Sequence, residues 1–458
     1  MKTTNFPDQI FKEYDIRGLF EKEFSEELIK KLGYEIGLKI KKYENKVCVG
    51  YDCRTHSPQC FKWLISGLNY AGLKIINLKE VPTPVTYYSG YIEELNCKSN
   101  IMITASHNPK EYNGFKITID NKAYFGEEIQ ELKNEIIKCE ETIPNNYKCE
   151  KFDIITPYVE LLTKKFQNLK NYKEKILFDC GNGMTGPTLK KILNNLNLNY
   201  EIMYEKPNGE FPNHPADPSK VANLKEIIEK QNQNNIELGL AFDGDSDRIG
   251  ITQKSGQIDP DTLAILIAKT LKNPKVIGEV KCSQIMYEEI NKIGSTLMSK
   301  TGHSNIKKLI RENPDTNFAV ELSGHIFFND KYFGYDDAIY AALRVIKLKV
   351  NKMNFKDEIK KLPKTFSTLE GRIDVDEERK FAIIKEFKEQ IKNSKENLKY
   401  KNLIETDGLR IEFENGWGLV RASNTGPKLS TRFEAKSQKE LNTIETKLMN
   451  ILNNIIEK

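Results

Sequence analysis

Short apolar runs recur along this chain, and each one stops abruptly at a polar or glycine-containing loop. The most clearly bounded are Lys46 to Gly50, Lys74 to Leu78, Ile101 to Ile103, Lys175 to Phe178 and Leu238 to Phe242. Stretches with the periodicity of amphipathic helices, such as 28–40, separate these runs. Strands that alternate with helices form βαβ units, so the pattern predicts an α/β protein with mostly parallel sheets. Functional loops are then expected at the carboxyl ends of the strands.

The strand at Ile101 leads into Thr104-Ala105-Ser106-His107-Asn108-Pro109. This loop presents a hydroxyl, Ser106, beside an imidazole, His107. On its own it is also compatible with an Asn-Pro turn whose side chains bond only to the local backbone. The same ambiguity does not extend to the strand at Leu238, which leads into Asp243-Gly244-Asp245-Ser246-Asp247-Arg248.

Three carboxylates at alternate positions repel one another unless a cation lies between them, so this second loop indicates a metal site. An EF-hand loop would need glycine at its sixth position and glutamate at its twelfth. Counted from Asp243, those positions hold Arg248 and Lys254, which excludes that motif. A hydroxyl loop together with a carboxylate loop points to phosphoryl chemistry.

A third loop, Gly181-Asn182-Gly183-Met184-Thr185-Gly186, follows the strand at Lys175 and precedes a helix. It fits the dinucleotide fingerprint G-x-G-x-x-G in outline, with Glu201 as the ribose-binding acid. The alternative is a tight strand-to-helix turn that needs glycine whatever it binds.

The last part of the chain differs in kind. Two strands, Leu409 to Glu414 and Trp417 to Ala422, are separated by Asn415-Gly416, a strong hairpin signal. The final helix opens with the capping box Ser437-x-x-Glu440. We expect its core face to consist of Leu441, Ile444, Leu448, Ile451 and Ile455.

Composition limits the classes of partner. The net charge of +5 is small against 70 basic and 65 acidic residues, and no basic block predicts binding to nucleic acid. The eight cysteines are scattered without a C-x-x-C pair, which favours free thiols in a reducing compartment. No signal peptide is evident at the N-terminus, and no apolar run is long enough to span a membrane. We therefore expect a cytoplasmic protein.

Several stretches together resemble the α-D-phosphohexomutase family, and within it the bacterial phosphomannomutase/phosphoglucomutase group. They occur in the family's order over nearly the whole length: Tyr14 to Gly18, Thr104 to Pro109, Asn113 to Lys116, Asp243 to Arg248, Lys281, Thr301 to Ser304, Glu321 to His325 and Arg421 to Thr425.

The resemblance implies four domains around a central cleft. Residues 1–150, 151–255 and 256–364 would be similar α/β domains with mixed sheets, carrying the phosphoserine loop, the metal loop and the sugar-recognition loop in that order. Residues 365–458 would form a smaller α+β domain, similar to the TATA-binding protein, with a phosphate-binding loop. It also implies that the glycine-rich turn binds no dinucleotide.

The resemblance also implies a role for each site residue. Ser106 would carry the phosphoryl group, and Asp243, Asp245 and Asp247 would hold Mg²⁺ together with the phosphoserine. The other catalytic residues would be His107, Lys116, His325, Arg17 and Arg248. The substrate would be bound by Tyr14, Arg17, Lys281, Thr301, Gly302, His303, Glu321, Ser323 and His325, and its distal phosphate by Arg421, Ser423, Asn424 and Thr425.

The implied activity is reversible conversion of hexose 1-phosphates, of mannose and glucose, into hexose 6-phosphates by an isomerase. A hexose 1,6-bisphosphate would be both intermediate and activator, and the enzyme would be a monomer. Leu322 stands where this group is expected to have methionine, which leaves the sugar preference open. The alternatives are a phosphoglucosamine mutase, a metal-dependent sugar phosphatase and an inactive sugar-phosphate-binding relative.

Overall fold

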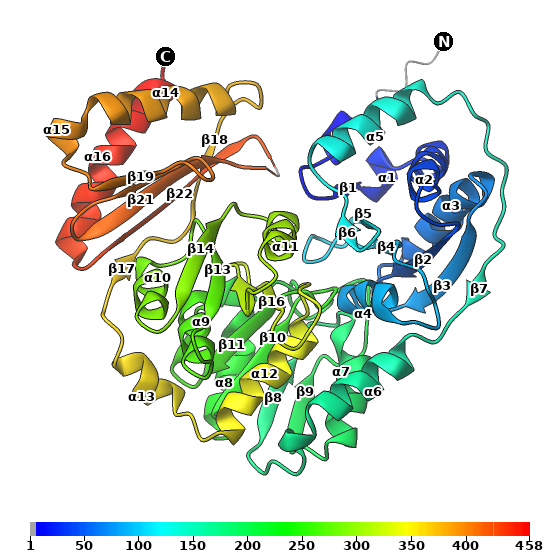
Figure 1. The fold of residues 1–458 in the computed structure, drawn as a ribbon, viewed down its shortest axis with the longest axis horizontal. Coiled ribbons are helices and arrows are strands. Elements are labelled where there is room, and N and C mark those ends of the chain that lie inside the picture. The colour runs from blue at the N-terminus through cyan, green and yellow to red at the C-terminus, as the bar shows by residue number, and fades with distance from the viewer. Residues whose placement is uncertain (1–5, 425) are drawn as a thin grey trace. The chain divides into compact units, whose positions relative to one another are not determined.

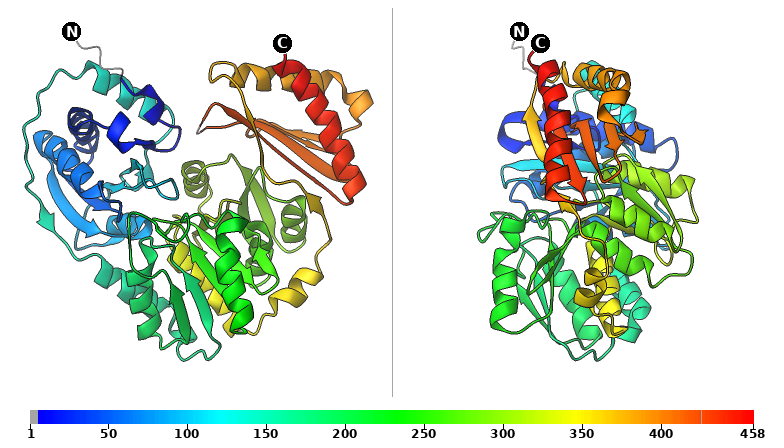
Figure 2. Two further views of the ribbon diagram at one scale, coloured as in Figure 1. Left: turned by 180° about the vertical axis from the view of Figure 1, so that it is seen from behind. Right: turned by 90° about the vertical axis from the view of Figure 1, so that its left-hand side faces the viewer.

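The computed structural model describes residues 6–424 and 426–458. The chain forms two compact units (Figures 1 and 2). Unit 1 contains residues 1–260 and 323–353, and unit 2 contains residues 261–322 and 354–458. Each unit is therefore built from two separate pieces of chain, and the crossings fall at Pro260, Leu322 and Met353.

Unit 1 contains two sheets. The strands are β1 (Ile16–Leu19), β2 (Lys46–Tyr51), β3 (Lys74–Glu80), β4 (Asn100–Ile103), β5 (Tyr112–Ile119), β6 (Lys122–Ala123), β7 (Glu150–Lys151), β8 (Ile176–Asp179), β9 (Tyr200–Met203), β10 (Leu238–Phe242), β11 (Ile249–Gln253) and β12 (Gly256–Ile258). A further strand, β16 (Ile326–Phe328), falls in the second piece of unit 1 and belongs to neither of these sheets. The first sheet has the order β1-β5-β4-β2-β3-β7, and the second has the order β12-β11-β10-β8-β9.

The helices of unit 1 fill the connections between these strands. They are η1 (Asp8–Ile10), α1 (Phe20–Glu23), α2 (Glu26–Ile40), α3 (Ser57–Tyr70), α4 (Thr83–Tyr88), η2 (Ser89–Tyr91), α5 (Glu127–Lys138), α6 (Ile155–Lys165), η3 (Gln167–Leu169), α7 (Thr185–Asn195), η4 (Val221–Leu224), α8 (Lys225–Gln233) and α12 (Ala338–Val350). The predicted alternation of strands and helices is confirmed.

The sheets of unit 1 are mixed rather than mostly parallel. β2 runs parallel to β3 and β4, but β5 pairs antiparallel with both β4 and β1. In the second sheet β8, β9 and β10 are parallel, and β11 is antiparallel to β10. In each sheet the antiparallel strand directly follows a loop that the sequence singles out: β5 follows the Ser106 loop, and β11 follows the loop 243–248. A short loop can return the chain only beside the strand it left, in the opposite direction.

Unit 2 also contains two sheets. Its elements are α9 (Pro260–Ala268), β13 (Lys275–Glu279), α10 (Gln284–Asn291), β14 (Ser295–Ser299), α11 (His303–Glu312), β15 (Phe318–Val320), α13 (Phe355–Lys360), β17 (Phe366–Ser367), β18 (Gly371–Asp374), α14 (Lys380–Asn393), α15 (Lys395–Leu398), β19 (Asn402–Ile404), β20 (Leu409–Glu412), β21 (Gly416–Ala422), β22 (Lys428–Ala435) and α16 (Gln438–Ile456). β13 lies between β14 and β15, and the three strands are parallel.

The C-terminal sheet is antiparallel, and α14 and α16 pack on it (Figure 2). The predicted hairpin is present, with Leu409 opposite Val420. Ser437 caps α16 as predicted, because its Oγ accepts from the Glu440 N–H at 3.2 Å. One detail of the core face differs: Leu452 is fully buried there and Ile451 only partly.

Two further expectations concern the whole chain. All eight cysteines lie in the described residues, and none forms a disulfide. In that same part of the chain, every helix lacks the combination of length and apolar character that crossing a bilayer requires.

Candidate functional site

The hydroxyl of Ser106 and the three carboxylates come together in unit 1. β4 delivers Ser106 and β10 delivers Asp243, each at the carboxyl end of its strand. The Ser106 Oγ donates a hydrogen bond of 2.7 Å to Asp243 Oδ2. His107 Nδ1 lies 3.2 Å from the same hydroxyl. Two loops 137 residues apart in sequence therefore meet at one oxygen atom.

Asp243, Asp245 and Asp247 are fully buried and form a ligand set. Each offers an oxygen atom within 4.8 Å of those of the other two. The Oδ1 atom of Asp245 is buried and has no hydrogen-bond partner among the described residues. Burial and the neighbouring Asp247 and Asp245 raise the pKa of Asp243 well above its ordinary value. An unpartnered oxygen and mutually repelling carboxylates fit a hard divalent cation, so the triad could hold a metal ion.

Lys116 is the cation that the structure places beside this triad. It lies on β5, and its buried ammonium group donates to Asp245 Oδ2 at 2.6 Å and also to Asp247 Oδ2. Burial lowers the pKa of Lys116, but the charges of Asp245 and Asp247 raise it by more, so the pKa lies well above its ordinary value. Burial likewise raises the pKa of Asp247, yet Lys116 and other cations bring it down to about 2. The lysine is therefore held charged.

A chain of contacts links the loop 243–248, called the metal loop below, to His325. The Arg248 Nε donates to His325 Nε2 at 3.0 Å, and His325 Nδ1 lies 3.0 Å from Asp336 Oδ2. Because Nε2 accepts a hydrogen bond, neutral His325 carries its proton on Nδ1, facing Asp336. The Asp336 carboxylate thus lies beside the ring nitrogen opposite the one that Arg248 contacts.

Arg17 and His107 complete the predicted residues around Ser106. The Arg17 Nη1 donates to Asn108 Oδ1 at 2.9 Å, and Nη2 pairs with Asp15. Tyr14 lies in the same segment and is half-buried. Desolvation, followed by the charges of Arg248 and Arg17, lowers the pKa of His107 well below its ordinary value. His107 is therefore neutral near pH 7.

In unit 2 the predicted residues of the third domain gather around Glu279, the last residue of β13. Its carboxylate accepts from Thr301 Oγ1 at 2.6 Å and from the Leu322 N–H at 3.1 Å. The Lys281 Nζ lies 3.5 Å from the same group. The Gly302 N–H donates to Glu321 Oε1 at 2.6 Å. Gly302, with φ of 113°, precedes α11, which begins at His303.

The C-terminal loop is tied to this group through Asp407. Its Oδ2 accepts from Arg421 Nε at 2.8 Å and from the Thr301 N–H at 3.0 Å. The carbonyl of Ser423 accepts from the buried Lys380 ammonium at 2.9 Å. Asn424 follows and is half-buried. The remaining predicted residue of this loop, Thr425, lies outside the described residues.

Ser323 is the first residue of the second piece of unit 1. Its Oγ atom is buried and has no hydrogen-bond partner within the described residues. A buried hydroxyl without a partner is expected where a polar ligand supplies one.

The glycine-rich turn in unit 1 has a structural reason. A Cβ atom on Gly183 would lie 2.7 Å from the carbonyl oxygen of Gly244, in the metal loop. The Met184 N–H donates to that same carbonyl at 2.9 Å, and Thr185 Oγ1 lies 2.6 Å from Ser246 Oγ. The turn therefore supports the metal loop. Glu201 pairs with Lys175 and Lys230 at 2.6 and 2.5 Å.

Four of the residues that organise these groups form no motif in the sequence: Thr83, Glu279, Asp336 and Asp407. Thr83 Oγ1 donates to Asp245 Oδ2 at 2.6 Å, and only its position in Pro82-Thr83-Pro84 distinguishes it. The other three are acids, and their neighbours along the chain do not show that Glu279 contacts Thr301, that Asp336 lies beside His325 or that Asp407 pairs with Arg421. Tertiary contact alone identifies them.

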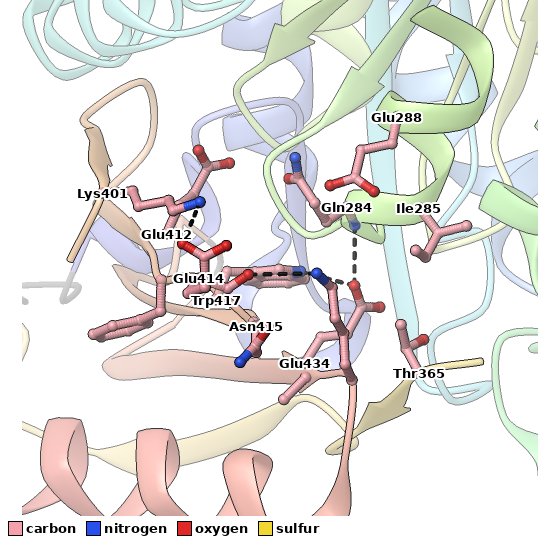
Figure 3. A pocket seen from close by; sticks show the side chains of 14 residues that line it. Gln284, Ile285, Glu288, Thr365, Lys401, Glu412, Glu414, Asn415, Trp417 and Glu434 are labelled. Carbon is pink, nitrogen blue, oxygen red and sulfur yellow. Dashed lines mark hydrogen bonds and ion pairs between the residues drawn. The ribbon is translucent and has the colours of Figure 1, made fainter. Parts of the chain in front are cut away.

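A pocket of about 220 Å³ lies elsewhere in unit 2, between α10, the β20–β21 hairpin and β22 (Figure 3). None of the predicted site residues lines it. Glu434 accepts there from Trp417 Nε1 at 2.9 Å and from the Gln284 N–H at 3.0 Å. These contacts join the C-terminal sheet to the start of α10.

Comparison with known proteins identifies the architecture. Models of four successive domains match, described as phosphoglucomutase/phosphomannomutase alpha/beta/alpha domains I, II and III and the C-terminal domain. They cover residues 8–142, 156–256, 259–366 and 370–451. This is the four-domain α-D-phosphohexomutase architecture, as expected from the sequence.

The chain is 38% identical to a phosphomannomutase/phosphoglucomutase of Pseudomonas aeruginosa, over 98% of this chain and 97% of the relative. A solved phosphoglucomutase/phosphomannomutase family protein from Burkholderia thailandensis superposes with a TM-score of 0.89 at 31% identity, covering 98% and 97% of the two chains. This protein therefore belongs to the phosphoglucomutase/phosphomannomutase family. A structure of Aspergillus fumigatus N-acetylphosphoglucosamine mutase with GlcNAc-6P and magnesium shares the fold, with a TM-score of 0.60, 16% identity and coverage of 98% and 97%.

Proposed function

We propose that this protein is an isomerase that reversibly converts hexose 1-phosphates into hexose 6-phosphates, with mannose and glucose as the sugars. The observation that carries the proposal is the 2.7 Å hydrogen bond between Ser106 Oγ and Asp243, within a buried set of three carboxylates and a lysine. A hydroxyl placed against a metal ligand set is suited to accept and return a phosphoryl group.

In this mechanism phosphorylated Ser106 donates its phosphoryl group to the free hydroxyl of the sugar phosphate. The resulting hexose 1,6-bisphosphate then reverses its orientation in the site and returns its other phosphoryl group to Ser106. Hexose 1,6-bisphosphate added to the solution would act as an activator. Arg17 and Arg248 would stabilise negative charge on the transferring group. Lys116 and His325 are the proposed proton donors and acceptors, and His107 would support the phosphoserine.

We propose Mg²⁺ as the metal, held by Asp243, Asp245, Asp247 and an oxygen of phosphorylated Ser106. When bound, this ion would draw charge away from the phosphoryl oxygens. Thr83 and Lys116 would keep Asp245 in place, since both donate to its Oδ2 atom at 2.6 Å. The Asp247 and Arg248 N–H groups, each 3.1 Å from Asp243 Oδ1, would orient the other oxygen of Asp243 toward Ser106.

The remaining predicted residues would bind the sugar phosphate. Arg421, Ser423, Asn424 and Thr425 are proposed to hold the phosphate that does not react, because one cation and several small donors form an anion cradle. Glu321 and Ser323 would bind sugar hydroxyls, with Tyr14, Lys281, Thr301, Gly302 and His303 around them. Mannose and glucose differ only at the 2-hydroxyl, so a site that makes no bond there accepts both.

We also propose domain boundaries near residues 150, 255 and 364. We propose that the protein functions in the cytoplasm. All eight cysteines, which lie in the described residues, are free thiols, as expected in a reducing compartment. The proposed partners are small sugar phosphates, and the proposed state is a monomer.

The test is ³¹P NMR of the purified protein with Mg²⁺ and a trace of glucose 1,6-bisphosphate. Parallel samples contain the 1-phosphates of mannose, glucose, glucosamine and N-acetylglucosamine. Conversion of the first two to 6-phosphates is the expected result. Preferential conversion of the glucosamine ester would instead make the protein a phosphoglucosamine mutase. Release of inorganic phosphate alone indicates a phosphatase, and no change in any sample indicates an inactive relative.

A further inference from the structure

Arg54 lies beneath the Ser106 loop and has no assigned role in the reaction described above. The residue is 1% exposed. The Nη2 atom donates to the carbonyls of Ser106 at 2.8 Å and Asn108 at 2.6 Å. The Nη1 atom donates to the carbonyls of Pro109 at 2.6 Å and Tyr112 at 3.1 Å. All four acceptors belong to the segment that carries Ser106 from β4 to β5.

Asp52 connects this guanidinium group to the other side of the same loop. Its Oδ2 lies 3.2 Å from Arg54 Nε and accepts from Thr104 Oγ1 at 2.7 Å. Thr104 Oγ1 in turn accepts from the Ser106 N–H at 2.9 Å. A buried guanidinium is costly unless it is paired and hydrogen-bonded. Here the ion pair with Asp52 and the four carbonyl bonds together satisfy that requirement. They also tie both the N–H and the carbonyl of Ser106 to this pair of side chains.

The backbone of Ser106 needs such support. Its φ is 53°, in the left-handed region that side chains other than glycine rarely occupy. Strained residues of this kind persist only where the surroundings hold them. In this conformation the Oγ atom reaches Asp243, so a change in the backbone would move the hydroxyl away from the metal ligands.

We propose that Arg54, with Asp52 as its counterion, is a positioning residue that holds the Ser106 hydroxyl in the orientation needed for phosphoryl transfer; this inference rests on the proposed mutase function. Arg54 touches none of the reacting groups and acts through the four carbonyls. Lysine at this position keeps the charge but cannot reproduce the planar fork that serves four acceptors.

The experiment compares Arg54→Lys with the wild-type enzyme in steady-state mutase assays and in transfer of phosphate from glucose 1,6-bisphosphate to Ser106, followed by intact-protein mass spectrometry. Displacing a reacting group by about 1 Å costs on the order of 100-fold. We expect kcat and the phosphorylation rate of Ser106 to fall by about that factor, with KM for the sugar phosphate little changed. In Arg54→Ala, low concentrations of guanidinium chloride should restore part of the rate, whereas equal concentrations of urea should not.

Arg344→Lys is the matched control. Arg344 lies on α12 of unit 1 and is half-buried; among the described residues its guanidinium bonds to Asp330 at 2.7 Å and to Tyr340, and not to the serine loop. It should lower the unfolding temperature without lowering kcat. Wild-type kcat in Arg54→Lys, or an equal loss of kcat in Arg344→Lys, overturns the positioning role alone. Absence of mutase activity in the wild type overturns the proposed function and this inference with it.

Discussion

Two buried arginines, one in each unit, hold loops by donating to backbone carbonyls, yet they serve different parts of the proposed reaction. Arg54 in unit 1 bonds to carbonyls on both sides of His107, in the loop of Ser106. Arg410 in unit 2 donates to the carbonyls of Val280 at 2.7 Å and Cys282 at 2.8 Å, on both sides of Lys281.

The two arginines differ in what balances their charge. Arg54 has Asp52 at 3.2 Å. Arg410 has Glu412 only at 3.8 Å, and its guanidinium lies 3.8 Å above the ring of Trp417. A cation on an aromatic face tolerates small shifts better than a set of directed hydrogen bonds does. Arg54 also bonds to four carbonyls of the Ser106 loop, whereas Arg410 bonds to two carbonyls beside Lys281. We therefore expect the loop that carries the proposed chemistry to be held more rigidly than the loop of the proposed sugar-binding residue Lys281.

The largest effect should come from replacing the hydroxyl itself. Ser106→Ala is expected to abolish turnover, because no phosphoserine can form. Ser423→Ala, which removes a comparable hydroxyl from unit 2, should leave kcat largely intact and raise KM. Mutase assays of both variants test whether the chemistry is confined to unit 1. Comparable loss of kcat in Ser423→Ala would remove the distinction between the two loops.

Removal of divalent metal should have the next largest effect. Chelation of the wild-type enzyme is expected to lower kcat by on the order of 10³-fold, since the carboxylate triad then offers no cation to the phosphoryl oxygens. Restoration by Mg²⁺ but not by K⁺ is the expected control. Binding of a hexose 6-phosphate to the chelated protein, measured by calorimetry, should persist because the phosphate grip lies in unit 2. Loss of that binding would show that the two regions are not separable.

Arg421→Ala tests the grip directly. A hydrogen bond to a charged group contributes about 1.5–3 kcal/mol, so KM for the sugar phosphate should rise roughly 10- to 100-fold. The phosphorylation rate of Ser106 measured at saturating bisphosphate should change much less. Arg421→Lys keeps the charge but not the planar fork, so its KM should lie between those of the wild type and Arg421→Ala. A pure kcat effect would contradict the assignment.

Arg410→Met should affect stability more than rate. The substitution leaves the carbonyls of Val280 and Cys282 buried without their donor, and each unsatisfied group costs about 1–3 kcal/mol. Chemical denaturation should show a lower free energy of unfolding, while KM rises modestly through the loosened Lys281. If the variant instead lowers kcat as far as Arg54→Lys does, the two arginines have the same role.

The smallest effect expected is a pH dependence of stability that arises from one histidine of unit 1. His214 follows shortly after Gly209, which packs against the backbone next to Arg54: a Cβ on Gly209 would be 2.4 Å from the Cys53 carbonyl oxygen. Burial lowers the pKa of His214, but its bond to Asp179 at 3.0 Å outweighs burial and raises the pKa to about 9, with Glu226 adding a smaller share. Tyr204 packs edge-on against the ring.

The sign of this effect follows from linkage. A folded-state pKa raised above the ordinary 6.5 means that the contribution is complete below pH 6.5 and is lost as pH rises through about 9. The unfolding temperature should therefore fall over that interval, and His214→Asn should reduce the slope. An unchanged slope in the variant would place the pH dependence elsewhere.

Much of this protein was accessible from the sequence. Strand-like runs that end at Ser106 and Asp243 are local patterns, and the period of an apolar run reports the element it forms. The metal-binding pattern of Asp243, Asp245 and Asp247 is likewise contained within five residues. The hairpin at Asn415-Gly416 and the cap at Ser437 are short-range signals and were predicted for the same reason.

Only the tertiary structure revealed which distant groups meet. Nothing near Arg54 in the sequence shows that it bonds to carbonyls more than fifty residues away, and Asp336 gives no local sign that it lies beside His325. The antiparallel placement of β5, which brings Lys116 to the carboxylates, was also not predicted. Local motifs identify the groups that react, because their chemistry depends on residue type and spacing. The groups that position them are determined by packing, since a buried ion needs partners wherever in the chain they come from.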